Sequence, residues 1–176
     1  MIIVEGMDNS GKTTLISRLT KDLGLKVVKS PTPLDMAFED AQVWLAEQLQ
    51  NNEPLTIYDR FHPISEVVYG PILRGVHHYP VVQWVEIMYK LNRCRPTIIY
   101  CRPSTATILD WKERDQLTGV MDRAPALIEA YDHIFTTVIK NLCMLTFHYD
   151  YVEDYYKEVL AYVTRHIDWR KARGEC

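Results

Sequence analysis

The sequence predicts a three-layer α/β fold, in which a five-stranded, mainly parallel sheet has helices on both faces. Two observations predict it. Short apolar runs alternate along the 176 residues with segments whose apolar side chains recur at helical spacing, and strands that alternate with helices form parallel sheets. A glycine-rich motif also stands between the first apolar run and the first helical segment, which is the strand–loop–helix context of a phosphate-binding loop.

The expected strands are short runs of apolar and β-branched residues. Residues 97–101 form the clearest run, because Pro96 and Pro103 flank it. The second run ends at residues 30–33, where two prolines disfavour helix at the residues before them. The strands are predicted at residues 2–5, 25–29, 55–58, 97–101 and 143–148.

The expected helices carry their apolar residues on one side. In the second helix, Ala41, Trp44, Leu45 and Leu49 share a face. The first helix stops near Gly24, because glycine is the usual residue just after a helix end. The helices are predicted at residues 12–21, 34–50, 64–75, 81–91, 105–116 and 126–142, and from residue 155 to residue 165 or beyond.

The phosphate-binding motif G-x-x-x-x-G-K-[ST] is met in full from Gly6 to Thr13. Its glycines let backbone N–H groups turn toward phosphate oxygens, and the helix that follows adds its positive end. Lys12 brings a positive charge to the outer phosphates, and the Thr13 hydroxyl can ligate Mg²⁺. A nucleoside triphosphate is therefore expected to bind at Gly6, Asn9, Ser10, Gly11, Lys12, Thr13 and Thr14.

A second candidate site follows the third strand, at the sheet edge where ligands of parallel sheets gather. Asp59 ends this strand and is placed to support Mg²⁺. Arg60 follows it where a hydrolytic ATPase would carry a further acid to align water. A guanidinium suits a second anion instead. The alternative is a strand-end pair that is only structural. Residues 30–31 and Arg102 also follow strands and are expected near the site.

The composition limits the class of protein. A net charge of −3 without a long basic run argues against bulk binding of nucleic acid, although a local basic cleft stays open. The N-terminus shows no signal peptide, and no apolar stretch reaches 18 residues. We expect a cytoplasmic protein without a membrane partner, built as one domain over residues 1–176.

Neither the cysteines nor the histidines suggest a metal site. His62, His77 and His78 precede prolines or tyrosine without a third ligand at metal-like spacing, so loop positions are expected for them. The cysteines have no metal-like spacing either, and buried thiols in a reducing compartment are expected. They are Cys94, Cys101, Cys143 and Cys176.

The chain resembles the thymidylate kinase and deoxynucleoside kinase superfamily of P-loop kinases. The segment from Glu5 to Thr14 is similar to the loop E-G-x-D-G-x-G-K-T-T of thymidylate kinases, with Asn9 in place of a glycine. Residues 59–75 resemble the D-R-[YH]…S…A-Y-x-G…R-G segment, and residues 93–97 resemble the R-P-D entry to the fourth strand. The resemblance covers roughly residues 1–140, and the chain is compact, as phage-encoded members often are. It implies the P-loop NTPase fold.

The resemblance also implies roles for particular residues. Lys12 would hold the β- and γ-phosphates of ATP, and Thr13 and Asp59 would hold Mg²⁺. A mobile lid is implied at residues 109–123, with Arg114 as its catalytic cation, and Tyr131 resembles the tyrosine in the helix after that lid. The catalytic residues would be Lys12, Asp59, Arg60 and Arg114.

On the acceptor side, the resemblance places Asp8 facing the nucleotide and gives Arg60 and Arg74 the task of holding it. Phe61 and Tyr69 lie nearby in the sequence and could stack on a base or belong to the core.

One departure from the family bears on the substrate. Thymidylate kinases carry E-P-G after the second strand, and deoxynucleoside kinases carry a carboxylate there that serves as base. Residues 30–33 contain no acid, and the next one is Asp35. A monophosphate oxygen is already ionised near neutral pH, whereas a hydroxyl needs a base. We therefore expect a deoxynucleoside monophosphate as acceptor. A hydroxyl acceptor, on a deoxynucleoside or on a nucleic acid, with Asp59 as base stays open.

A third function belongs to another class. The charges of the implied lid alternate in sign, as on a solvated helix face. If such a segment cannot close, the chain would be a regulatory module that binds nucleotide without turnover. The sequence leaves open whether the protein forms a homodimer.

Overall fold

The computed structural model contains a five-stranded sheet, and all four strand pairings are parallel. The strand order is β2-β3-β1-β4-β5. The strands are β1 (Ile2–Glu5), β2 (Lys26–Lys29), β3 (Thr56–Asp59), β4 (Thr97–Cys101) and β5 (Thr146–Tyr149). The structure describes residues 1–31, 38–51, 53, 55–110, 119–142, 144, 146–153 and 155–174. The predicted parallel sheet is confirmed.

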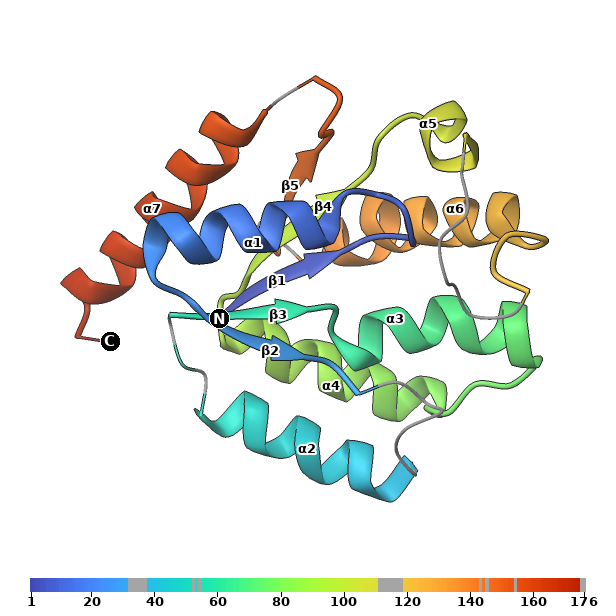
Figure 1. Ribbon diagram of the computed structural model, residues 1–176. Helices are drawn as coiled ribbons and strands as arrows, with labels where there is room; N and C mark the ends of the chain where they lie inside the picture. Colours follow the sequence, from blue (N-terminus) through green and yellow to red (C-terminus); the bar gives the residue numbers. More distant parts are fainter. Residues whose placement is uncertain are drawn as a thin grey trace.

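Helices cover both faces of this sheet, as Figure 1 shows. Alternate residues of β1 point to opposite faces, so Ile2 and Val4 pack with α1 and α7, whereas Ile3 packs with the other helices. This gives the predicted three layers. The helices are α1 (Lys12–Leu23), α2 (Phe38–Asn51), α3 (His62–Tyr69), α4 (Val81–Arg93), α5 (Thr105–Leu109), α6 (Ala124–His133) and α7 (Tyr156–Ala172).

Two helical segments continue in the wider π form. The segment η1 (Gly70–Arg74) extends α3 and η2 (Ile134–Ile139) extends α6. The sequence predicted one continuous helix over each of these regions, because the spacing of apolar residues does not reveal an inserted π-turn. Gly75 ends η1 with a φ of 69°, a left-handed conformation that glycine adopts without strain.

Most predicted elements differ from the observed ones by a few residues at their ends. The last strand starts at Thr146 rather than at residue 143. The helix predicted over residues 105–116 leaves the helical conformation at Asp110, and residues 111–118 lie outside the described part of the chain. Within that part, no helix is both long and apolar enough to cross a membrane.

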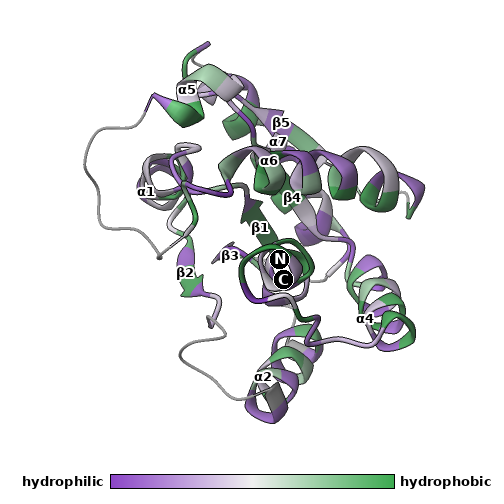
Figure 2. Cartoon of the chain, turned by 90° about the vertical axis from the view of Figure 1, so that its right-hand side faces the viewer, coloured by the Kyte–Doolittle hydropathy of each residue, from purple (hydrophilic) through white to green (hydrophobic). Residues whose placement is uncertain are grey.

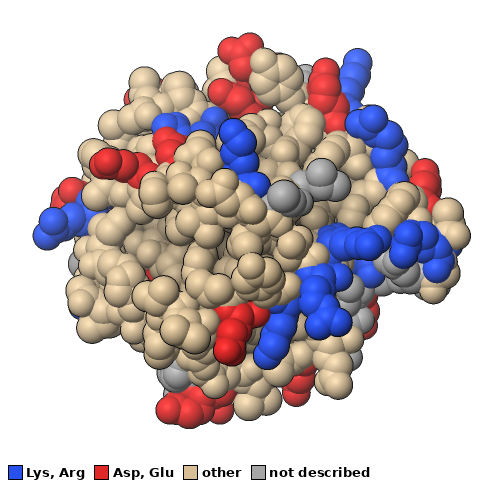
Figure 3. All heavy atoms as spheres, turned by 180° about the vertical axis from the view of Figure 1, so that it is seen from behind, with Lys and Arg blue, Asp and Glu red and all other residues tan. Residues whose placement is uncertain are grey.

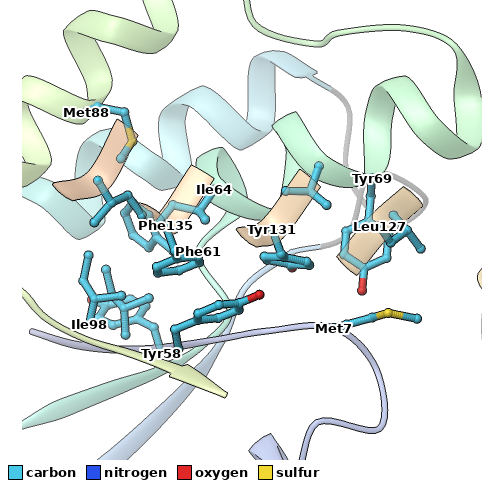
Figure 4. Close-up of a cluster of buried hydrophobic side chains, with 14 of the residues drawn as sticks. Met7, Tyr58, Phe61, Ile64, Tyr69, Met88, Ile98, Leu127, Tyr131 and Phe135 are labelled. Atoms are coloured by element: carbon cyan, nitrogen blue, oxygen red, sulfur yellow. The ribbon is translucent and has the colours of Figure 1, made fainter. Parts of the chain in front are cut away.

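The larger core cluster lies between the sheet and helices α2, α3, α4 and α6. Figure 4 shows its rings side by side, and the Tyr100 and Phe135 rings stack with centroids 4.1 Å apart. Tyr131 stacks beside both of them at 6.1 and 6.4 Å. Figure 2, seen from the right of Figure 1, shows apolar β1 enclosed by these helices. The cluster therefore fixes the tyrosine ring of α6 just below the carboxyl ends of the strands.

Candidate active site

The phosphate-binding loop lies between β1 and α1, as its sequence context predicts, and its backbone needs glycine. Gly6 has a φ of 142°, and a Cβ there would stand 2.5 Å from the Cys101 carbonyl oxygen. Gly11 caps α1 with a φ of 85°, and a Cβ there would meet the Tyr151 ring at 2.6 Å. The loop is thus a close-packed cradle of backbone, the form in which N–H groups bind phosphate.

Asn9 takes a left-handed conformation, with a φ of 66°, at the position where the loop that this segment resembles carries a glycine. Asparagine tolerates this conformation better than most residues. Its side-chain amide also donates to the Ile108 carbonyl at 3.3 Å, which ties the loop to α5. The substitution of a glycine therefore preserves the loop geometry.

We expect Asn9→Gly to keep the melting temperature and the affinity for an ATP analogue close to those of the parent. Asn9→Val should cost about 1–2 kcal/mol of unfolding free energy, because a β-branched side chain is strained at positive φ. Urea unfolding of both variants measures the difference. Equal losses in the two would show that the amide contact, rather than the backbone conformation, matters at this position.

Lys12 lies in the loop as a buried cation. Its side chain is 7 % exposed, and its ammonium donates to the Met7 carbonyl at 2.7 Å. Burial, and next the positive charge of Arg60, lower the pKa of Lys12 to about 8. The Ser10 hydroxyl is also buried and has no hydrogen-bond partner among the described residues. Both groups are free to turn toward a phosphate that enters the loop.

The residues predicted to hold Mg²⁺ lie at the same edge of the sheet. Thr13 is exposed in the first turn of α1. Asp59 ends β3 opposite Val4 of β1 and interacts electrostatically with Lys12. A hydroxyl and a carboxylate are ligands that Mg²⁺ accepts beside phosphate oxygens. The oxygen-only donor set therefore fits this ion.

Arg60 stands at the centre of a charged network beyond β3. Its guanidinium forms an ion pair with Asp8 of the phosphate loop and donates to the Tyr131 hydroxyl at 3.2 Å. It also lies 4.9 Å from the centre of the Tyr69 ring. Arg60 has a φ of 69°, a strained conformation for a non-glycine residue that persists only where its surroundings impose it. Asp8, Arg60 and Tyr69 thus lie together in one cluster beyond β3.

Glu5 anchors this network from below and has no predicted role. It is fully buried at the end of β1 and accepts hydrogen bonds from the Phe61 N–H at 2.6 Å and from Ser65 and Tyr131. Burial raises the pKa of Glu5, while Arg60 acts in the opposite direction. The only feature of the sequence that could have pointed to a role for Glu5 is its position just before the phosphate-binding motif.

The structure decides between the two roles that the sequence left open for Phe61. The Phe61 ring is 0 % exposed and packs edge-on against Tyr58 at 5.8 Å and beside Trp44 at 6.0 Å. It has no surface to offer a base, so it belongs to the core (Figure 4). Phe61 has an extended backbone just before α3, and its ring points inward.

Arg74 lies apart from Arg60, in a second polar cluster. It donates to both carboxylate oxygens of the buried Glu66, at 2.5 and 2.6 Å, and His78 approaches Glu66 at 3.3 Å. His62, in the first turn of α3, completes the cluster. The prediction of a loop position for His62 is therefore wrong. Because Arg74 already neutralises the carboxylate, the cluster has no need of a cation.

The stability of the protein should depend on His62 between pH 6.5 and pH 4. Burial, and next the charges of His78 and Arg74, lower its pKa to about 4, while its ring shares a 2.7 Å hydrogen bond with Tyr79. As the pH falls below 6.5, the unfolded chain gains a proton that the folded one refuses, so stability is lost. The loss approaches about 3 kcal/mol near pH 4.

Urea unfolding of the wild type and His62→Asn across this range isolates the effect, because all other titrating groups are shared. The variant should have the shallower slope. Parallel slopes would mean that His62 is protonated in the folded state.

The remaining predicted cation, Arg114, lies outside the described residues, as does most of the implied lid. The described end of that segment forms a turn from Gly119 to Arg123, with Val120 buried and Arg123 exposed. The other strand-end arginine, Arg102, is held by Asp132 through two hydrogen bonds of 2.8 and 3.0 Å. It is therefore a structural residue in this state.

Tyr151 is a second site residue that the sequence did not reveal. It follows β5, is 37 % exposed, and lies against Gly11 of the phosphate loop. Tyr151 is far from the phosphate loop in the sequence. It reaches the loop because β5 lies only one strand away from β1 in the sheet.

Comparisons with known proteins add fold relatives. No family model matches the chain, and no curated sequence matches it either. Among solved structures, the YorR protein of Bacillus subtilis in complex with phosphorylated GDP is 19 % identical, with 97 % of both chains covered and a TM-score of 0.75.

Two further structures resemble the chain less closely. Deoxyadenosine kinase of M. mycoides with bound dATP is 17 % identical, with a TM-score of 0.57 over 99 % of this chain and 98 % of that one. Thymidylate kinase of Candida albicans is 17 % identical, with a TM-score of 0.56 over 97 % and 91 %. At these identities the likeness is one of fold. Together with the phosphate-binding loop and the strand order, it shows that the chain has the α/β fold of the deoxynucleoside- and thymidylate-kinase-like P-loop kinases.

Proposed function

We propose that the protein transfers the γ-phosphoryl group of ATP to a deoxynucleoside monophosphate. The observation that carries this proposal is the pair of cations at the carboxyl ends of β1 and β3. Lys12 lies inside the phosphate loop and Arg60 lies beyond it, near enough for the charge of Arg60 to lower the pKa of Lys12. Two like charges held close together are suited to two facing groups of phosphates, which they neutralise on binding.

The donor would bind in the loop, with Lys12 against its outer phosphates. Thr13 and Asp59 would hold Mg²⁺, which supplies charge neutralisation across the phosphates when bound. The Tyr151 ring, beside Gly11, is placed to contact the nucleoside part of the donor. Arg114 keeps its proposed place as a lid cation on the donor side.

The acceptor would lie against Arg60, with Asp8 and Tyr69 beside it. The guanidinium fork matches a phosphate better than a water molecule. Arg74 would contribute less directly, because its Nη2 donates to both oxygens of the Glu66 carboxylate. Glu5 is buried beneath this site and cannot reach a substrate. Its task is to position Tyr131 and the Phe61 backbone.

A hydroxyl acceptor is the second candidate. Asp8 and Asp59 are both partly exposed carboxylates at the site, and either meets the chemical requirement for a base. One fold relative is named a deoxyadenosine kinase. The monophosphate proposal is preferred because Asp8 is already bound to Arg60 and because the described residues after β2, Ser30 and Pro31, carry no acid.

A substrate panel tests both candidates. The protein is incubated with ATP, Mg²⁺ and each deoxynucleoside or its monophosphate, and the products are separated by chromatography. Diphosphate products from monophosphates would support the proposal, and monophosphates from nucleosides would replace it with the hydroxyl reading. ATP binding without any phosphorylated product would instead indicate a regulatory module.

A further inference from the structure

A cavity lies at the amino-terminal edge of the sheet, opposite the carboxyl-terminal edge that carries the phosphate loop. It has a volume of about 710 Å³, which is the size of a pocket for a small organic ligand. Residues just before β4 and β5 form one wall, and the outer half of α7 forms the other. We call it the α7 cavity, and its lining includes Arg95, Met144, Tyr162, Arg165, His166 and Trp169.

The lining of the α7 cavity combines an aromatic ring with positive charge. The Trp169 ring is 41 % exposed, and the guanidinium groups of Arg173 and Arg95 lie 5.0 and 5.4 Å from its centre. Among the described residues, no carboxylate forms an ion pair with Arg95 or Arg165. Such a lining favours a ligand that has both a flat ring and an anionic group.

The cavity opens on a basic surface. Figure 3 shows Lys and Arg side chains gathered on the right-hand side of the rear view, which is the side of the C-terminal end of α7. The exposed basic residues of the elements around the cavity include Lys90, Arg93, Arg95, Arg165, Lys171 and Arg173. The chain as a whole has a net charge of −3, so this concentration is local rather than a general property.

Two further features fit a binding site. Arg95 has a φ of 49°, a strained conformation that glycine would adopt freely, and such strain gathers at ligand sites. The Tyr162 hydroxyl at the wall is buried without a hydrogen-bond partner among the described residues. A buried hydroxyl normally has a partner, and a bound polar ligand would provide one.

We propose that the α7 cavity is a second nucleotide site, in which Trp169 stacks on a base and Arg95 and Arg165 hold the phosphates. A free nucleotide fits this lining better than a nucleic acid strand does. A strand would need several exposed aromatic side chains to stack its successive bases, and Trp169 is the exposed tryptophan in the described lining. The site is separate from the phosphate loop and does not depend on the reaction proposed above.

Equilibrium dialysis with radiolabelled ATP tests the proposal. The phosphate loop is first disabled by Lys12→Met, because a nucleotide analogue that filled the loop would also enter the α7 cavity. We expect this variant still to bind one ATP per chain. Arg95→Gly, Arg165→Ala and Trp169→Ala should each weaken it by about 10- to 100-fold, as expected for a lost charged hydrogen bond or stacking platform.

Arg95→Gly also separates binding from folding. Glycine relieves the backbone strain, so this variant should keep or raise the melting temperature while it loses the ATP of the α7 cavity. Arg93→Ala, a neighbouring arginine that does not line the cavity, is the matched control and should bind like the wild type.

Three results would overturn the proposal. The first is no ATP bound by Lys12→Met, and the second is an equal loss in Arg93→Ala and Arg95→Gly. The third is displacement of ATP by a short single-stranded oligonucleotide at far lower concentration than by a mononucleotide, which would assign the surface to nucleic acid. If Lys12→Met still bound ATP in the α7 cavity while the substrate panel gave no product, the proposed reaction would be wrong and the proposal of a second nucleotide site would stand.

Discussion

Lys12→Met should abolish phosphoryl transfer and make the protein more stable. Turnover should fall by at least about 10³-fold, the lower end of what a cation contributes at a transferring phosphoryl group. The gain in stability follows from the cost of burying the ammonium, which lowers the pKa of Lys12 from 10.5 to about 8. This shift corresponds to a destabilisation of up to about 3 kcal/mol at pH 7, which the thioether of methionine would not incur.

The pH dependence of this gain has a definite sign. Below pH 8 the lysine is charged in both the folded and the unfolded chain, so the full cost is present. Between pH 8 and 10.5 the folded chain releases the proton while the unfolded chain keeps it, so the wild type gains stability. The advantage of Lys12→Met should therefore shrink as the pH rises through this window.

Urea unfolding at pH 7 and pH 9.5, beside a turnover assay at pH 7, measures both effects in one set of samples. Loss of activity with a higher unfolding free energy cannot come from misfolding. A variant that kept wild-type turnover would remove Lys12 from the donor site, and one that lost stability would show that its hydrogen bond to Met7 outweighs the burial cost.

The sequence predicted the parts of the site that depend on local chemistry. The phosphate loop lies where its motif and flanking elements indicated, and the strand over residues 97–101 has the predicted bounds. Both are defined by residues close together in the chain, through glycine conformation or proline flanks. The position of Asn9 follows the same logic, because its φ of 66° is one that asparagine tolerates.

The network around Glu5 could not be predicted in this way. Glu5 and Tyr131 are 126 positions apart and meet only because α6 packs across the end of β1. Whether a strand-end aromatic faces the core or the cleft depends on its backbone angles, so the sequence left both roles open for Phe61, and the structure places it in the core. Arg74 lies one turn beyond Gly70 in a π-helical segment, and the extra residue of that turn alters the direction of side chains after it.

Arg60→Ala should impair use of the acceptor far more than use of ATP. The guanidinium is held by Asp8 and Tyr131 above the buried Glu5, so it is already oriented for an anion. Its removal should lower kcat/KM for the acceptor by about 10²–10³-fold, as expected when one partner of a buried charged contact is lost. The KM for ATP should change by less than about threefold, because interactions with the donor phosphates are retained.

Steady-state kinetics with each substrate varied in turn separates the two effects. Arg60→Lys should lie between the wild type and Arg60→Ala, because an ammonium keeps the charge but not the two-pronged geometry. Arg102→Ala is the control, since this strand-end arginine is bound to Asp132 and should affect stability without changing the ratio of the two KM values. Equal losses for ATP and acceptor in Arg60→Ala would contradict the placement.

The charge of Arg60 has a further measurable consequence on the donor side. Its repulsion is one cause of the lowered pKa of Lys12, so Arg60→Ala should raise that pKa. ATP binding to the free protein, which weakens as Lys12 loses its proton above pH 8, should then persist to higher pH in the variant. If ATP binding weakened over the same pH range in Arg60→Ala as in the wild type, the two cations would not interact. Lys12 and Arg60 would then not face one another across two sets of phosphates.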